Sequence, residues 1–297
     1  TTLFRSIKKY AKYLIDQGEN IGILENDYGA VNVDMMLLKD LEGENCELEM
    51  IAGGCDADCH KRRFRTKLIA MGMCGYDRVI VEPSGIYDVD EFFDVLRDDP
   101  IDRWYEIGNV ITVVDAKLEE KLSDEADYLL ASEAANAGCI VLSRSQEASE
   151  KEIENTVSHL NAAMEKVQCK RRFKDEIVVK DWTAFDEADY ETFLSCGYVP
   201  ENYRKMHIEE GETFKSLYFM NLDKTTDEII EAAKHILEDK ECGRVFRVKG
   251  FLKDEAGEWL ELNATHQEMR ICPIPEGQEV VIVIGEELNE ERIQQYF

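Results

Sequence analysis

The sequence has no long apolar stretch and no dense set of cysteines. In its 297 residues no apolar run approaches the roughly 20 residues of a membrane-spanning helix, and no signal peptide opens the chain. The 9 cysteines are scattered among charged residues rather than spaced as a disulfide framework, which favours reduced thiols. We therefore expect a cytoplasmic protein with no membrane partner.

Basic residues are also scarce. The chain has 35 Lys and Arg residues against 63 Asp and Glu residues, and its formal net charge is -28. A surface this acidic repels the phosphates of nucleic acids and attracts small cations. Nucleic acid is therefore not an expected partner. Apolar residues make up 44% of the chain and charged residues 33%, which is typical of a folded globular protein. The length suffices for two domains, each with its own core.

Short apolar runs alternate with amphipathic helical segments through the first two thirds of the chain. Strands are expected at residues 21–24, 47–51, 78–82, 110–114, 139–142 and 177–179. Helices are expected at residues 3–17, 89–97, 123–137 and 149–167, with a further one that ends near residue 73. Because runs such as Val79–Val81 are apolar on both faces, we expect a mostly parallel sheet covered by helices.

The pattern changes near His207. The acidic residues 209–212 form either an exposed linker or a simple loop. Beyond them, strands are expected at 214–220, 243–252, 259–264, 267–271 and 280–284, with helices at 225–237 and at the end of the chain. This order predicts a smaller α+β domain, roughly ferredoxin-like. The expected domains are residues 1–207 and 213–297.

Polar side chains follow several of the expected strands. Asp27, Glu82, Asp115 and the turn 143–146 all stand just beyond a strand end. Open α/β sheets bind ligands at the carboxyl ends of their strands, where these residues would meet. Read alone, the segment 78–88, which contains Glu82, is equally well an ordinary core strand with a polar end.

Five motifs carry a resemblance to a known family. In chain order they are Asn26-Asp27-Tyr28-Gly29 through Asp34, Glu82-Pro83-Ser84-Gly85, Val113-Val114-Asp115-Ala116, Arg247-Val248-Lys249-Gly250-Phe251 and Val283-Ile284-Gly285-Glu286-Glu287-Leu288. Together they resemble the CobW-like branch of the P-loop GTPases, the CobW/HypB/UreG superfamily, over nearly the whole chain. Each motif is weak alone, but five in the family's order are fairly specific. The resemblance implies a P-loop-type sheet with helices on both faces and a smaller C-terminal domain.

The family's activity implies roles for particular residues. The resemblance implies that this chain hydrolyses a nucleoside triphosphate, with GTP favoured. Its nucleotide state would control how it binds a divalent metal ion and delivers that ion to a client metalloprotein. Thr1 and Thr2 would end a phosphate loop that lies upstream, with the Thr1 hydroxyl on Mg²⁺. Glu82 would hold Mg²⁺ or its waters, the Gly85 N–H would contact the terminal phosphate, and Asp34 lies in the switch segment. Without the resemblance, Thr1 is simply a helix N-cap.

The base-recognition motif departs from the family. Where GTPases have Asn-Lys-x-Asp, this chain has Ser143-Arg144-Ser145-Gln146. Gln146 offers guanine a neutral carbonyl in place of a carboxylate. Use of GTP, use of ATP and loss of nucleotide binding therefore all stay open.

The metal motif departs as well. Cys55 matches the first position of the family's Cys-x-Cys-Cys, but the other two cysteine positions hold Ala57 and Asp58, and Cys59 lies one place late. Asp58, His60 and Asp27 add oxygen and nitrogen donors suited to Zn²⁺ or another divalent transition metal. A C-x-x-x-C spacing is weaker evidence than C-x-x-C, and cysteines are commonly inert core residues.

Two alternatives follow from these departures. One is a catalytically degenerate metal-binding or regulatory module of the same fold, and the other is an ATPase of a related deviant P-loop class. A homodimer is a further open alternative for the oligomeric state.

Overall fold

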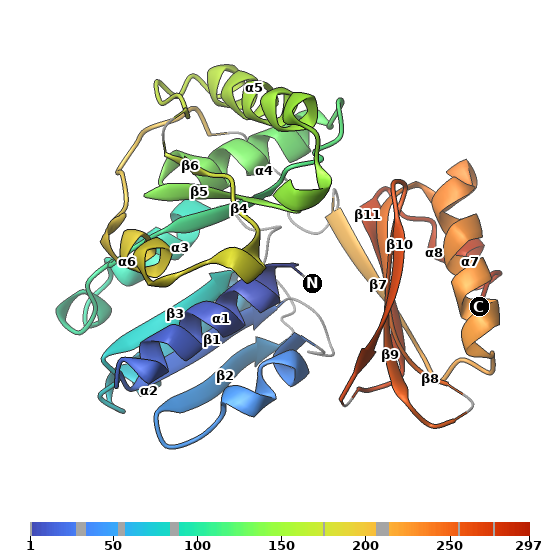
Figure 1. Cartoon of the computed structure of the whole chain (residues 1–297), viewed down its shortest axis with the longest axis horizontal. Helices are drawn as coiled ribbons and strands as arrows, with labels where there is room; N and C mark the ends of the chain where they lie inside the picture. Colours follow the sequence, from blue (N-terminus) through green and yellow to red (C-terminus); the bar gives the residue numbers. More distant parts are fainter. Residues whose placement is uncertain are drawn as a thin grey trace. The chain divides into compact units, whose positions relative to one another are not determined.

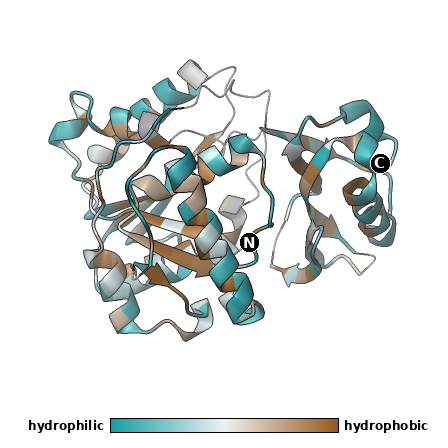
Figure 2. Ribbon diagram, turned by 90° about the horizontal axis from the view of Figure 1, so that it is seen from above, coloured by the Kyte–Doolittle hydropathy of each residue, from teal (hydrophilic) through white to brown (hydrophobic). Residues whose placement is uncertain are grey.

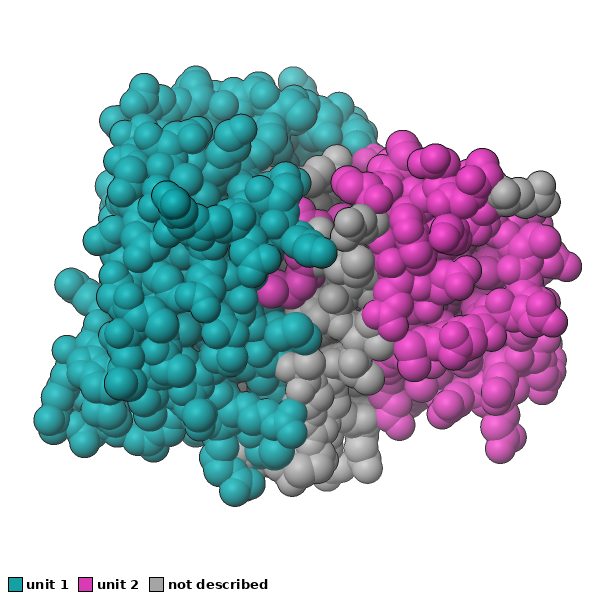
Figure 3. All heavy atoms as spheres, turned by 90° about the horizontal axis from the view of Figure 1, so that it is seen from below, with its two compact units in different colours: residues 1–28, 38–207 teal, residues 29–37, 208–297 magenta. Residues whose placement is uncertain are grey.

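The computed structural model describes residues 2–27, 34–52, 57–83, 89–174, 176–205, 214–254, 256–275 and 277–297. The chain divides into two compact units, one of residues 1–28 and 38–207 and the other of residues 29–37 and 208–297 (Figure 3). Apolar residues gather on the strands of both units, and the outer faces of the helices are hydrophilic (Figure 2).

The first unit begins with a three-stranded parallel sheet in the order β2-β1-β3. Its strands are β1 (Ile21–Asp27), β2 (Cys46–Ala52) and β3 (Arg78–Pro83). The helices that accompany it are α1 (Thr2–Asp16), α2 (Ala57–Gly72) and α3 (Val89–Leu96), with short 3-10 turns at Lys39–Leu41 and Ile101–Arg103. A further 3-10 turn, Asp34–Leu37, is assigned to the second unit.

Helices cover both faces of this sheet. Leu24 of β1 packs against Phe64 and Leu68 of α2 and Val95 of α3. Ile23, the neighbouring buried residue, points to the opposite face because side chains alternate along a strand. The helix that lies along that face is α1 (Figure 1).

A second parallel sheet follows, in the order β4-β5-β6. Its strands are β4 (Ile111–Asp115), β5 (Cys139–Ser143) and β6 (Ile177–Val178). Its helices are α4 (Asp124–Ala135), α5 (Glu150–Lys166) and α6 (Glu187–Ser195), with 3-10 turns at Ser145–Glu147 and Trp182–Ala184. All five residues of β5 are buried, which explains why its first four residues are all apolar.

The second unit is a five-stranded antiparallel sheet in the order β10-β9-β8-β11-β7. Its elements are β7 (Phe214–Met220), α7 (Thr226–Glu238), a 3-10 turn (Lys240–Cys242), β8 (Arg244–Lys253), β9 (Trp259–Thr265), β10 (Met269–Ile274), β11 (Val280–Glu286) and α8 (Glu290–Gln294). Because β11 is antiparallel to both β7 and β8, the β7-α7-β8 segment is a split β-α-β unit. Ile229 and Ala233 of α7 pack on Val248, Leu262 and Val283 of the sheet.

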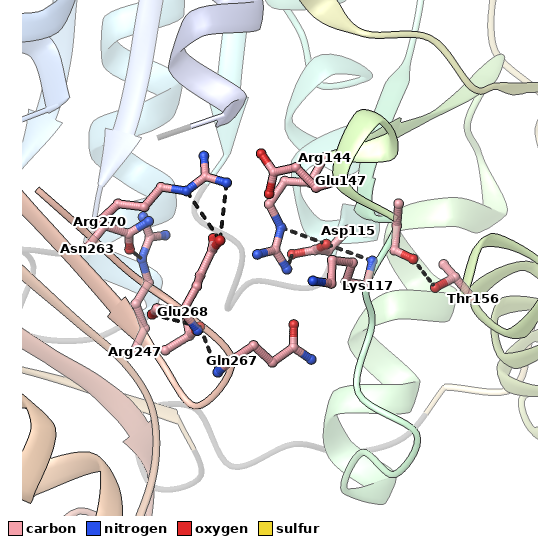
Figure 4. A network of polar contacts seen from close by, with 12 residues as sticks. Asp115, Lys117, Arg144, Glu147, Thr156, Arg247, Asn263, Gln267, Glu268 and Arg270 are labelled. Carbon is pink, nitrogen blue, oxygen red and sulfur yellow. Dashed lines mark hydrogen bonds and ion pairs between the residues drawn. The ribbon is translucent and has the colours of Figure 1, made fainter. Parts of the chain in front are cut away.

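Polar contacts brace the hairpins of this sheet. Arg247 Nε of β8 donates to Asn263 Oδ1 of β9 at 2.6 Å, and the Arg270 guanidinium meets Glu268 at 3.1 Å (Figure 4). Lys249 is buried with its ammonium group 4.9 Å from the centre of the Phe251 ring. The Arg247–Phe251 motif thus serves the packing of its own domain.

The expected fold class is confirmed: helix-covered parallel strands are followed by a smaller α+β domain. Among the residues that the structure describes, no helix is both long enough and apolar enough to span a bilayer.

Candidate functional site

The ends of three parallel strands meet at one edge of the first sheet. Glu25 of β1 pairs in register with Glu82 of β3, and Asp27 pairs with Ala52 of β2. We call the side of the sheet where β1, β2 and β3 end its carboxyl edge. The last residues of these strands, Asp27, Ala52 and Pro83, are therefore brought to one edge of the sheet.

The first turn of α1 lies at the same edge. Only residues 17–20 connect α1 to β1, and the helix lies along the strand in the opposite direction (Figure 1). The 15 residues of α1 span about 22 Å at roughly 1.5 Å per residue, and the 7 residues of β1 span about 23 Å at roughly 3.3 Å per residue. Thr2, the first residue of the helix, is therefore level with the end of β1. A helix N-terminus presents unpaired backbone N–H groups that favour an anion.

The structure adds a carboxylate that the sequence analysis passed over. Glu25 has only 3% of its surface exposed, and Glu82 beside it is half-buried. Residues paired in register on adjacent strands project from the same face of the sheet, so the two carboxylates are neighbours. The signal in the sequence was an acidic residue directly after the apolar run Ile21–Leu24, but its pairing with Glu82 depends on strand register.

The other residues expected to bind phosphate and magnesium are placed less fully. Thr1 and Gly85 lie outside the described residues. The backbone of Asp27 ends β1, and that of Asp34 begins a 3-10 turn.

The turn after β5 is anchored by an ion pair. Asp115, at the end of β4, pairs in register with Ser143, at the end of β5. Arg144 directs Nε to Asp115 Oδ1 at 3.0 Å and Nη2 to Oδ2 at 2.6 Å, so both carboxylate oxygens are engaged (Figure 4). The Lys117 N–H donates to Oδ1 at 2.9 Å. With a φ of 56°, Arg144 is in the left-handed region, and the bidentate contact offsets the cost of that conformation.

This anchoring decides which side chains of the expected base-binding turn face solvent. Ser143 is buried and Arg144 is held by Asp115, whereas Gln146 and Glu147 are exposed. Gln146 Nε2 lies 3.5 Å from Glu147 Oε1, which is a weak contact. Glu147 therefore supplies a carboxylate one position after the place where the family has its aspartate. Glu147 lies outside the four motif positions, so a match of the motif residue by residue does not include it.

Candidate metal ligands stand at the beginning of α2. The helix starts at Ala57, so Asp58, Cys59 and His60 are in its first turn, and the preceding strand, β2, ends at Ala52. Cys59 is half-buried, and His60 has 3% of its surface exposed. Burial, and to a lesser extent the charge of Arg63, lowers the pKa of His60, which favours the neutral imidazole.

The chemistry of these donors fits a zinc-like ion. Thiolate sulfur and imidazole nitrogen are the ligands that Zn²⁺ takes most often in proteins. Cys55 lies outside the described residues. Among the side chains that the structure does describe, no three of the types His, Cys, Asp and Glu converge closely enough to hold a metal ion.

Comparison with known proteins places this arrangement in a family. A profile described as "CobW/HypB/UreG, nucleotide-binding domain" matches residues 1–174. The crystal structure of Zn(II)-bound YjiA GTPase from E. coli aligns with a TM-score of 0.37 and 15% identity, over 98% of this chain and 94% of that chain. A Zn(II)-bound triple mutant of YjiA GTPase aligns with the same TM-score and identity, over 100% of this chain and 95% of that chain. No match was found among curated proteins. Since the profile covers more than half of the chain, the protein belongs to the CobW/HypB/UreG family.

Proposed function

We propose that the protein hydrolyses a nucleoside triphosphate, with GTP favoured, and couples its nucleotide state to the binding of a divalent metal ion and its delivery to a client metalloprotein. Residues 1–207 would be the catalytic domain and residues 213–297 the C-terminal domain. The observation that carries the proposal is the convergence at the carboxyl edge: the start of α1, the end of β3 and the start of α2 all lie there.

The phosphates would lie at the start of α1. Thr1 and Thr2 would offer hydroxyl groups there, and the helix N-terminus offers backbone N–H groups. Glu82, with Glu25 beside it, would bind Mg²⁺ or its waters, and the Gly85 N–H would contact the terminal phosphate. Mg²⁺ would supply positive charge that stabilises the transferring phosphoryl group.

The base would contact the turn after β5. Arg144 contributes by holding the turn in place, because its guanidinium is bound to Asp115. Gln146 and Glu147 are the exposed groups that can read the edge of a base. Guanine presents two N–H donors on its Watson–Crick edge, and a carboxylate accepts both better than an amide carbonyl does. This argument favours GTP over ATP.

The metal would bind at the start of α2, through Cys59 and His60 with Cys55, Asp58 or Asp27. Coupling has a direct structural route, since β1 lies between β2 and β3 in the sheet. Both of these outer strands end at the carboxyl edge, β2 at Ala52 and β3 at Pro83. A change at the terminal phosphate can therefore alter the geometry of the metal ligands without a long-range pathway.

Titration calorimetry of the full-length protein with Mg²⁺ and either GTP or ATP tests the nucleotide step. We expect binding of GTP, loss of at least tenfold in affinity or turnover on Glu82→Gln, and little change on Glu44→Gln. Glu44 is an exposed glutamate before the first residue of β2, at the opposite edge of the sheet. Absence of heat with both nucleotides would reject the proposal.

A degenerate metal-binding or regulatory module is the second candidate. The changed residues of the base-binding turn favour it. GTPases of this branch carry a lysine and an aspartate there, whereas this chain has Arg144, which is bound to Asp115, and Gln146. Zinc binding that is identical with and without nucleotide, together with no release of phosphate, would select this second function.

A further inference from the structure

Two cysteines from distant parts of the chain meet at the amino end of β5. Cys139 is the first residue of β5, and Cys196 caps the end of α6. This end of the strand is opposite the one that carries Ser143. The pair is therefore separate from the proposed nucleotide and metal sites.

A backbone bridge and a side-chain contact bring the two cysteines together. Ala137 and Tyr198 form an antiparallel bridge, which holds the segments that carry Cys139 and Cys196 beside each other. The Cys139 thiol donates a hydrogen bond to the Cys196 sulfur. This contact places the two sulfur atoms near each other, as the formation of a disulfide bond requires.

The two segments are also pressed closely together. A Cβ atom on Gly138 would lie 2.1 Å from the Gly197 carbonyl oxygen and 2.5 Å from that of Cys196, so only glycine fits there. The Val110 N–H holds the same segment by donating to the Gly197 carbonyl oxygen at 2.9 Å. Both cysteines join one apolar cluster with Trp182 and Phe193.

The two thiols differ in exposure and acidity. Cys139 has 4% of its surface exposed, whereas Cys196 is half-buried. A hydrogen bond from Cys139 to the Cys196 sulfur lowers the pKa of Cys196. The same hydrogen bond, with burial, raises the pKa of Cys139. Cys196 is therefore the better nucleophile and the one that a small oxidant can reach, and Cys139 is the thiol placed to attack it afterwards.

We propose that Cys139 and Cys196 are a reversible oxidation site, at which a peroxide converts the two thiols into a disulfide. The Cys196 thiolate attacks one peroxide oxygen and breaks the O–O bond, which gives a sulfenic acid and releases water after proton uptake. Cys139 Sγ then attacks Cys196 Sγ, so that the S–S bond forms and the S–O bond breaks with release of a second water. Two thiols lose two electrons in total, and hydrogen peroxide gains them. A reducing dithiol reverses the change.

The disulfide would tie the end of α6 to the amino end of β5. Because it would close a long loop in the unfolded chain, the oxidised protein should melt at a higher temperature than the reduced protein. Nucleotide binding should change little, since Ser143 stands at the other end of the strand.

Peptide mapping of the reduced full-length protein after treatment with hydrogen peroxide tests this proposal. Remaining thiols are alkylated, and the digest is analysed by mass spectrometry with and without dithiothreitol. We expect a linked peptide pair that contains Cys139 and Cys196, and its loss on reduction. Because the wild-type protein is used, the result does not depend on the folding of a variant. If exposed Cys74 and Cys272 are oxidised while Cys139 and Cys196 stay alkylated, the proposal is wrong.

Two variants separate the roles of the thiols. In Cys139→Ser, Cys196 should stop at the sulfenic acid and react with dimedone. In Cys196→Ser, Cys139 should remain a thiol at the same peroxide dose. Cys74→Ser is the matched control and should still form the linked pair. Faster oxidation of Cys139 in the Cys196→Ser variant would reverse the assignment and overturn the proposal.

Discussion

Replacing Arg144 with methionine should destabilise the first unit by about 2 kcal/mol. Methionine keeps most of the aliphatic stem but removes both hydrogen bonds to Asp115, at 3.0 and 2.6 Å. The Arg144 side chain is 10% exposed and that of Asp115 is 39% exposed. The pair thus lies between an exposed ion pair, worth roughly 0–1 kcal/mol, and a fully buried one, whose disruption costs about 3–5 kcal/mol.

A double-mutant cycle with Asp115→Asn isolates the interaction itself. The asparagine keeps an acceptor for the Lys117 N–H, so the cycle removes the charge pair with little other change. We expect a coupling energy of about 1.5 kcal/mol from urea unfolding followed by circular dichroism.

Arg65 and Asp98 provide the matched control pair. They are the same residue types, but their contact is 3.4 Å long and their side chains are 40% and 50% exposed. The corresponding cycle should give about 0.5 kcal/mol or less. Equal coupling energies in the two cycles would refute the argument that burial and bidentate geometry make the Arg144 contact strong.

Three further predictions address the site and the pH dependence of stability. Glu147→Gln should reduce the preference for GTP over ATP about tenfold in titration calorimetry, whereas Glu150→Gln, an exposed glutamate three residues later, should not. Cys59→Ala or His60→Ala should weaken Zn²⁺ binding at least tenfold in a competition assay with a chelating dye, and Cys74→Ala, just beyond the other end of α2, should leave it unchanged. Burial raises the pKa of Glu133 from 4.5 to about 7. Between these two values the folded state holds a proton that the unfolded state has lost, so stability falls as the pH rises through this window. Glu133→Gln should remove this dependence and stabilise the protein at pH 8 by about 1–3 kcal/mol in urea unfolding; an unchanged pH profile would contradict it.

The order of the elements was predictable because local pattern and tertiary environment agree. The segment Cys139–Leu142 is apolar throughout, and the structure buries β5 on both faces. Ser149 and Glu152 form a capping box that starts α5 where the sequence predicts a helix. At such positions the chemistry of single residues determines the element, so no information about distant contacts was needed.

Contacts between distant residues could not be predicted in the same way. The engagement of Arg144 by Asp115 depends on the alignment of β4 with β5, and the sequence showed only a replaced motif. The meeting of Cys139 and Cys196 depends on a single bridge after α6. No sequence pattern indicates that a cysteine at the start of a strand contacts another cysteine at the end of a helix.

The carboxylates at the end of the first sheet show what strand register adds to motif reading. The motif at Glu82 is visible in the sequence, and Glu25 looks like one polar residue in a turn. Shifting β1 by one residue against β3 would place Glu25 on the opposite face of the sheet, because side chains alternate along a strand. In the observed register the two carboxylates face the same side, at the edge where α1 begins. If both contribute to a cation site, Glu25→Gln should weaken the Mg²⁺ dependence of nucleotide binding as Glu82→Gln does, and the double variant should lose less than the sum of the two. The measurement is calorimetry at several Mg²⁺ concentrations. If the loss in the double variant equals the sum of the two single losses, the two carboxylates act independently.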